Sequence, residues 1–180
     1  MYQLLKQIVR TGIKTEAAPQ PDEALRVAPQ RLHEEILRVF GSALSIRHVD
    51  TGSCNACELE IHAVNNAYYN IEGLGIKFVA SPRHADLLLV TGPVSRHMET
   101  ALRRTYDAMP EPKLVVAIGD CACDGGIFAS NCAAGGGENY ATCGKVSNVI
   151  PVDVAVSGCP PTPTAILQGI LTAISVPKQK

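Results

Sequence analysis

The sequence predicts an α/β fold, a doubly wound domain with a mostly parallel sheet flanked by helices. From residue 44 onward, short apolar runs alternate with segments of helical pattern. Two of the runs, ADLLLVT at 85–91 and KLVVAI at 113–118, are nearly continuous, as in strands that helices cover on both faces. The 180 residues, 46% of them hydrophobic, are enough for one substantial core.

A helical extension is expected before this domain. Residues 1–14 form an amphipathic pattern whose basic positions recur every four residues, at Lys6, Arg10 and Lys14. Such a helix can lie on an anionic membrane surface, dock into a partner's groove or rest on its own domain. Residues 15–29 are polar and rich in proline, which is typical of a linker, and a second helix is expected from Pro29 to before Gly41. We therefore divide the chain into an extension, 1–43, and a domain, 44–180.

The elements of the domain follow from the change between apolar runs and helical periodicity. The runs predict strands at 44–49, 75–80, 85–91, 113–118 and 150–156. The periodic segments between them predict helices at 57–69, 95–108 and 163–174. In a parallel sheet of this kind, ligands bind beyond the carboxyl ends of the strands, so the loops that follow the strands are the places to look for a site.

Composition excludes several classes of function. The 16 basic and 17 acidic residues give a net charge of -1, and the chain has five Tyr, three Phe and no Trp, so a nucleic-acid partner is not expected. No apolar run approaches the roughly 18–20 residues of a membrane-spanning helix. The seven cysteines are an odd number without a secretory signal, which favours a reducing compartment and metal or redox chemistry over structural disulfides.

Cysteines occur in three loops that each follow a predicted strand. Cys54 and Cys57 follow the first strand, Cys121 the fourth, and Cys159 the last. Loops at the carboxyl ends of parallel strands share one edge of the sheet, so these thiols can converge. Four thiolates need a cation to offset their charge, and an iron–sulfur cluster with four cysteine ligands suits the arrangement.

Other interpretations of the cysteines stay open at this point. The pair Cys54 and Cys57 alone also describes a thioredoxin-like dithiol, and structural zinc is a further option, although a second C-x-x-C or a histidine pair is absent from the sequence. Cys123, Cys132 and Cys143 are interpreted as small hydrophobic residues of the interior. The glycines at 135–137 lack the pattern of a phosphate loop and are interpreted as a flexible segment.

Four stretches, in this order, resemble the small cluster-bearing subunit shared by nickel–iron hydrogenases and respiratory complex I, its 20 kDa or B subunit. They are Cys54-Asn55-Ala56-Cys57-Glu58, the run SPRHADLL at 81–88, Gly119-Asp120-Cys121-Ala122, and Gly158-Cys159-Pro160-Pro161-Thr162-Pro163. The resemblance implies a flavodoxin-like fold and one 4Fe-4S cluster on Cys54, Cys57, Cys121 and Cys159. Complex I members typically carry two adjacent cysteines where this chain has C-x-x-C. That spacing and the short chain resemble the energy-converting, membrane-bound (group 4) hydrogenases, including formate hydrogenlyase-type complexes.

The resemblance also implies a function within a larger assembly. It implies an electron-transfer subunit that connects a ferredoxin-like iron–sulfur subunit to a large subunit with a nickel–iron site, held at the cytoplasmic face of the membrane by integral membrane subunits. Glu58 matches a family glutamate for which proton transfer or cluster tuning is one interpretation and a solvated or helix-start charge another. Arg83 and His84 are expected either to face the cluster or a partner subunit, or to have only a packing role within the domain. A complex I-like quinone oxidoreductase and an isolated dithiol oxidoreductase are the alternatives.

Overall fold

The computed structural model describes residues 2–12, 34, 43–131 and 138–175. The predicted linker and, except for Glu34, the predicted second helix lie outside these residues, as do the three glycines at 135–137 and Cys132. The amphipathic segment at the start forms helix α1, Tyr2–Thr11. Among the helices that the structure describes, none combines the length and apolar character needed to cross a bilayer.

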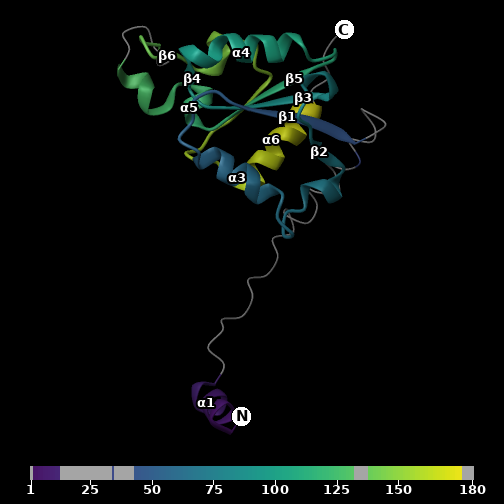
Figure 1. The fold of residues 1–180 in the computed structure, drawn as a ribbon, viewed down its shortest axis with the longest axis vertical. Helices are drawn as coiled ribbons and strands as arrows, with labels where there is room; N and C mark the ends of the chain where they lie inside the picture. Colours follow the sequence, from purple (N-terminus) through teal and green to yellow (C-terminus); the bar gives the residue numbers. More distant parts are fainter. Residues whose placement is uncertain (1, 13–33, 35–42, 132–137, 176–180) are drawn as a thin grey trace.

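The domain is built on a five-stranded parallel sheet, as predicted (Figure 1). Its strands run in the order β2-β1-β3-β5-β7, the 2-1-3-4-5 order of flavodoxin-like folds. Their bounds are β1 Leu44–Asp50, β2 Ile76–Phe78, β3 Leu87–Thr91, β5 Leu114–Ile118 and β7 Val154–Val156. The register pairs Asp50 with Thr91, Thr91 with Ile118, and Ile118 with Val156, so four strands end at the same level.

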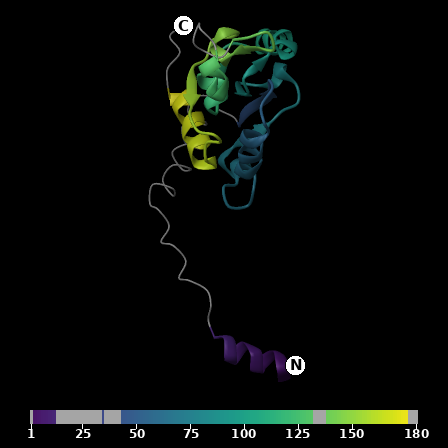
Figure 2. The same ribbon diagram turned by 90° about the vertical axis from the view of Figure 1, so that its left-hand side faces the viewer.

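Helices cover both faces of this sheet. Helices α3 (Ala56–Val64) and α6 (Pro163–Ser175) pack side by side on one face, and α4 (Arg96–Asp107) covers the other (Figures 1 and 2). Alternate residues of β3 therefore enter different cores, with Leu87 and Leu89 on the α3/α6 side and Leu88 and Val90 on the α4 side. All residues of β3 and β5 are buried, which confirms that the continuous apolar runs mark strands covered twice.

Three predicted elements are clearly shorter in the structure, and the strand expected at 75–80 spans only Ile76–Phe78. The helix expected at 57–69 ends at Val64, because the side-chain oxygen of Asn66 accepts hydrogen bonds from the backbone N–H groups of Tyr68 and Tyr69, 2.9 and 3.0 Å away. The strand expected at 150–156 begins only at Val154. Proline at 151 has no N–H to donate to a neighbouring strand. The Asp153 carboxylate accepts the hydrogen bond from the N–H of Val115, which a backbone oxygen would accept if the strand began earlier.

A small antiparallel ribbon lies beside the α4 face and was not predicted. It consists of β4 (Val94–Ser95) and β6 (Thr142–Gly144). Strands of two or three residues carry no alternation that a sequence pattern could detect. The remaining short elements are α5 (Asp120–Cys123) and the 3₁₀ turns η1 (Ile71–Leu74), η2 (Pro82–His84), η3 (Gly126–Asn131) and η4 (Val146–Asn148).

Candidate metal centre

The four cysteines predicted to be ligands all follow carboxyl ends of sheet strands. Cys54 and Cys57 lie between β1 and the first turn of α3, Cys121 in the short helix after β5, and Cys159 in the turn after β7. Because these strands end at the same level, their loops share one edge of the sheet (Figure 1). Cys54 and Cys159 are exposed, whereas Cys57 and Cys121 are half-buried.

Local hydrogen bonds shape the loop that carries Cys54. The Asp50 carboxylate at the end of β1 accepts bonds from the N–H groups of Gly52 and Ser53, at 2.8 and 2.9 Å. The Ser53 hydroxyl in turn accepts one from the N–H of Asn55, at 3.2 Å. Asn55 is left-handed, with φ 73°, a conformation that asparagine tolerates better than most residues. This turn starts α3 directly after Cys54, so that Cys57 falls in the first helical turn.

The backbone at Gly119 lies against the Cys57 thiol. A Cβ atom at position 119 would be only 2.6 Å from Cys57 Sγ, and the φ of +88° is one that residues with a side chain rarely adopt. A Cβ at Gly126 would similarly be 2.8 Å from Cys121 Sγ. The two glycines therefore let the backbone of the loop after β5 lie close to the sulfurs of Cys57 and Cys121, two cysteines that are far from each other in the sequence.

The charges of the four cysteines act on one another's ionisation. Burial is the main cause that raises the pKa of Cys57 to about 12, and the nearby negative charges of Glu58, Cys54, Cys121 and Cys159 act in the same direction. Burial also raises the pKa of Cys121, with additional contributions from Cys159 and Cys54. Each thiolate thus opposes ionisation of the others, and a bound cation would remove this opposition.

Cys123 points away from this group. Its sulfur donates to the backbone oxygens of Val156 and Ala117, at 3.5 and 3.7 Å, and packs against the core on the α4 side. Burial raises its pKa to about 11. In the loop after β5, Cys123 therefore belongs to the interior, which leaves Cys121 as the candidate ligand of this loop.

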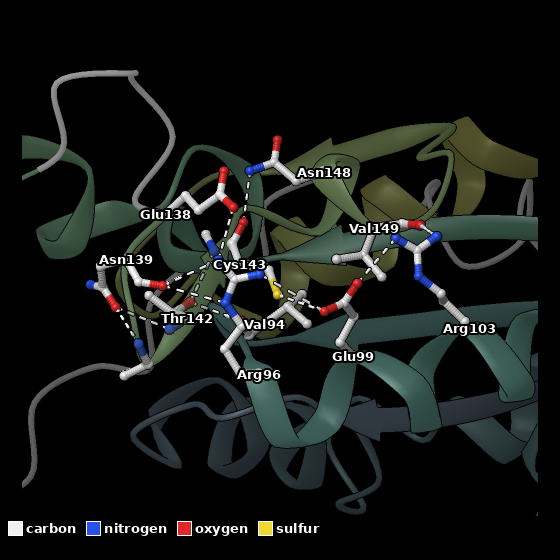
Figure 3. Close-up of polar contacts among 12 residues, drawn as sticks. Val94, Arg96, Glu99, Arg103, Glu138, Asn139, Thr142, Cys143, Asn148 and Val149 are labelled. Carbon is white, nitrogen blue, oxygen red and sulfur yellow. Dashed lines mark hydrogen bonds and ion pairs between the residues drawn. The ribbon is translucent and has the colours of Figure 1, made fainter.

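Cys143 is also interior and lies in the β4/β6 ribbon (Figure 3). It is 4% exposed, and its thiol donates to Glu99 Oε2 at 3.3 Å. The Arg96–Glu138 ion pair, 2.8 Å, ties the ribbon to α4, and Arg103 donates to the backbone oxygen of Val149 at 2.9 Å. This network holds the segment after residue 138 against α4. It gives Cys143 a packing role, in agreement with the interpretation from the sequence.

Glu58 is buried beside Cys57, so it is not a solvated surface charge. It is 7% exposed, and within the described part of the chain its carboxylate oxygens have no hydrogen-bond partner. A basic group nearby is His48, whose Nε2 is 3.9 Å from Glu58 Oε1 and 3.2 Å from the Thr91 hydroxyl. Burial lowers the pKa of His48, against the opposite effect of Glu58. Sequence reasoning missed His48, although its place near the end of β1 was available as a signal.

The structure does not bring Arg83 and His84 to the cysteines. Both are exposed in the turn η2, which precedes the amino end of β3, where Asp86 bonds Ser45 at the start of β1. The cysteine loops lie at the opposite, carboxyl ends of the same strands. The expectation that Arg83 faces a cluster therefore gains no support from the geometry.

The donor set fits a cluster better than a single ion or a reactive dithiol. In the described ranges, no three His, Cys, Asp or Glu side chains form a group that could hold one metal ion. A 4Fe-4S cluster spreads four thiolates over four irons. A thioredoxin-like dithiol would use only Cys54 and Cys57 and would leave Cys121 and Cys159 without a role.

Comparison with known proteins gives consistent matches. The family model described as "NADH ubiquinone oxidoreductase, 20 Kd subunit" matches residues 54–173. A probable membrane-bound hydrogenase subunit of Pyrococcus furiosus is 41% identical over 78% of this chain and 79% of its own length. Formate hydrogenlyase subunit 7 of Escherichia coli is 39% identical over 81% of this chain, which spans about half, 54%, of that protein.

Two further matches extend the range of relatives. The B-type subunit of NADH-quinone oxidoreductase from Desulfovibrio desulfuricans is 44% identical over 73% of this chain and 67% of its own. Among solved structures, a chain of the membrane-bound sulfane sulfur reductase, an archaeal respiratory membrane complex, superposes with a TM-score of 0.62. Its identity is 31%, over 79% of this chain and 73% of that one. The relatives are thus subunits of several different oxidoreductase complexes.

Proposed function

Because the chain belongs to the family of the 20 kDa subunit of NADH ubiquinone oxidoreductase, we propose that it is an electron-transfer subunit that holds one 4Fe-4S cluster. The proposed ligands are Cys54, Cys57, Cys121 and Cys159. The observation that carries the proposal is the position of these four thiols in loops at one edge of the sheet, where four strands end at the same level. When bound, such a cluster supplies a one-electron relay.

The residues around the thiols suit this site. The absence of a side chain at Gly119 and Gly126 leaves room for Cys57 and Cys121 against the backbone. Cys54 and Cys159 are exposed, which suits a site that a partner subunit can approach. The buried Glu58, whose charge acts on Cys57, lies 3.9 Å from His48 and so adds a polar pair next to this ligand in the chain.

The partners we propose are those of a membrane-bound nickel–iron hydrogenase. They are a large subunit with a nickel–iron site, a ferredoxin-like iron–sulfur subunit and integral membrane subunits. Similarity to the hydrogenase and formate hydrogenlyase subunits supports this choice. A peripheral place on the cytoplasmic side of the membrane agrees with α1, whose exposed Lys6 and Arg10 suit an anionic surface.

A complex I-like quinone oxidoreductase is the second candidate. The NADH-quinone oxidoreductase relative supports it, since its identity to this chain, 44%, is as high as that of the hydrogenase subunits. The C-x-x-C spacing of Cys54 and Cys57 favours the hydrogenase type, because complex I members of the family typically carry two adjacent cysteines at this place.

The two candidates differ in what co-purifies with the chain. An affinity-tagged full chain would be isolated anaerobically from membranes with its neighbours, and the complex would be characterised by mass spectrometry, nickel analysis and a hydrogen-evolution assay. We expect a nickel-bearing large subunit and hydrogen evolution. A nickel-free complex with quinone-dependent activity would replace the hydrogenase proposal by the second candidate. An isolated, iron-free chain that reduces disulfides would reject both.

A further inference from the structure

Two of the cysteine loops are joined by a reciprocal pair of hydrogen bonds. The N–H of Asp120 donates to the backbone oxygen of Gly158 at 3.0 Å, and the N–H of Gly158 donates to Asp120 Oδ1 at 2.7 Å. Asp120 immediately precedes Cys121, and Gly158 immediately precedes Cys159. The pair therefore connects the residues next to two proposed ligands, across 38 positions of sequence.

The geometry makes this connection short and stiff. A length of 2.7 Å is at the short end for an N–H bond to a carboxylate, as charge-assisted bonds are. Gly158 has φ +138°, and a Cβ there would be 2.6 Å from Pro161 Cα, so the turn that carries Cys159 has little freedom. Another bond, from the N–H of Gly119 to the oxygen of Val156 at 2.8 Å, fixes the same two segments one step earlier.

In the part of the chain that the structure describes, aspartates make the same reciprocal arrangement between two other pairs of segments, at the opposite edge of the sheet. Asp153 and Val115 exchange bonds of 2.9 and 2.8 Å between the same two strands, β7 and β5. Asp86 and Ser45 exchange bonds of 2.8 and 2.9 Å between β3 and β1. The fold thus uses aspartates to close the ends of its ladder, and Asp120 differs from the others in its place beside the cysteines.

We propose that Asp120 is a positioning residue that sets the separation of the Cys121 and Cys159 thiols. The inference rests on the proposed function, since it assigns Asp120 a role toward the same cluster. With the pair intact, both thiols are placed before the cluster binds. Without the Asp120 carboxylate, the Gly158 N–H loses its acceptor, and only the backbone bonds from Asp120 and Gly119 still connect the Cys159 turn to the Cys121 loop. Residues that orient ligands in this way typically change metal affinity by about 10- to 100-fold when substituted.

Asp153 offers a matched control. Asp120→Ala and Asp153→Ala each remove one reciprocal carboxylate between β5 and β7, so both are expected to lower the unfolding temperature. Asp120→Asn keeps a side-chain oxygen that can accept from the Gly158 N–H and is expected to behave as wild type. Asp120→Glu keeps the carboxylate but lengthens the connection by one methylene, so it changes the spacing without removing the charge.

The test uses the anaerobically purified full chain. Iron and acid-labile sulfide content, the EPR spectrum of the reduced protein and the rate of iron loss to a chelator would be measured with the unfolding temperature. We expect iron loss from Asp120→Ala to be faster by about ten-fold or more, with wild-type rates for Asp120→Asn and Asp153→Ala. If Asp120→Ala does not accumulate, a changed EPR spectrum and faster iron loss in Asp120→Glu are the expected results.

Three outcomes distinguish failure of this inference from failure of the proposed function. Suppose that the wild-type chain binds iron and that Asp120→Ala, or Asp120→Glu in its place, loses iron at the wild-type rate. This result would overturn the role of Asp120 and leave the proposed function standing. Equal acceleration in Asp153→Ala would also overturn it, because general loss of stability would then explain the effect. Wild-type chain without iron would refute the proposed function, and the inference with it.

Discussion

Substitution of Gly119 by alanine is expected to displace the Cys57 thiol. The new Cβ would be 2.6 Å from Cys57 Sγ, and ordinary contact begins at 3.4 Å, so the sulfur or the backbone must move by about 0.8 Å. Functional sites require their groups to be held within about 0.5 Å. In addition, Gly119 has φ 88° and ψ 154°, a region that is essentially restricted to glycine and costs other residues about 1–3 kcal/mol.

The matched control for this substitution is Gly92→Ala. Gly92 has φ +136° at the carboxyl end of the neighbouring strand β3, and a Cβ there would collide with the Thr51 hydroxyl and not with a cysteine. Both variants are therefore expected to lower the unfolding temperature. Iron content and EPR after anaerobic purification should separate them, with most of the iron lost in Gly119→Ala and retained in Gly92→Ala. Full iron content and an unchanged EPR spectrum in Gly119→Ala would refute the reasoning.

Three further predictions follow from other parts of the chain. Cys121→Ser should lose its iron, whereas Cys123→Ser should keep it, because the Cys123 thiol bonds backbone oxygens of the interior. Iron analysis of both variants checks this prediction, and equal loss of iron from the two would contradict it. Reversing the charge of Lys6 and Arg10 on α1 should weaken co-sedimentation with anionic vesicles by at least about ten-fold, since each basic residue near such a surface contributes about 1 kcal/mol. Unchanged binding to the vesicles would contradict a membrane role for α1. Burial lowers the pKa of His48 below 6.5, so just below that pH the unfolded chain binds a proton at His48 more readily than the folded chain does. The free energy of unfolding should therefore fall as the pH drops below 6.5. Denaturant unfolding of His48→Gln should show a smaller fall, and an identical pH dependence would contradict the assignment.

The fold could be predicted because its signals are long and redundant. The runs at 85–91 and 113–118 predicted β3 and β5, and the complete burial of both strands explains why they are continuous apolar sequence. The general rule that sites lie beyond the carboxyl ends of parallel strands then placed Cys54, Cys121 and Cys159 at one edge. Element ends were less predictable, since the side-chain oxygen of Asn66 captures the N–H groups that would continue α3, and the helix stops at Val64.

The finer details of the site depend on backbone conformation that spacing does not encode. Cys121 and Cys123 lie in the same loop, and the choice of Cys121 in the sequence follows from the resemblance. The backbone conformation after Gly119 is what lets the Cys123 thiol reach backbone oxygens of the interior. The bond between Asp120 and Gly158 joins two loops whose approach follows only from strand order and register. Glu58 could equally have been a surface charge, and its burial follows from how α3 packs on the sheet.

The central claim is that four distant cysteines hold one iron–sulfur cluster. The most direct measurement is the iron and acid-labile sulfide content of the anaerobically purified full chain, determined for wild type, Cys159→Ser and Cys143→Ser. We predict about four iron and four sulfide per chain in wild type and in Cys143→Ser, and loss of both in Cys159→Ser. Wild-type chain free of iron, or Cys159→Ser with the full iron content and an unchanged EPR spectrum, would contradict the claim.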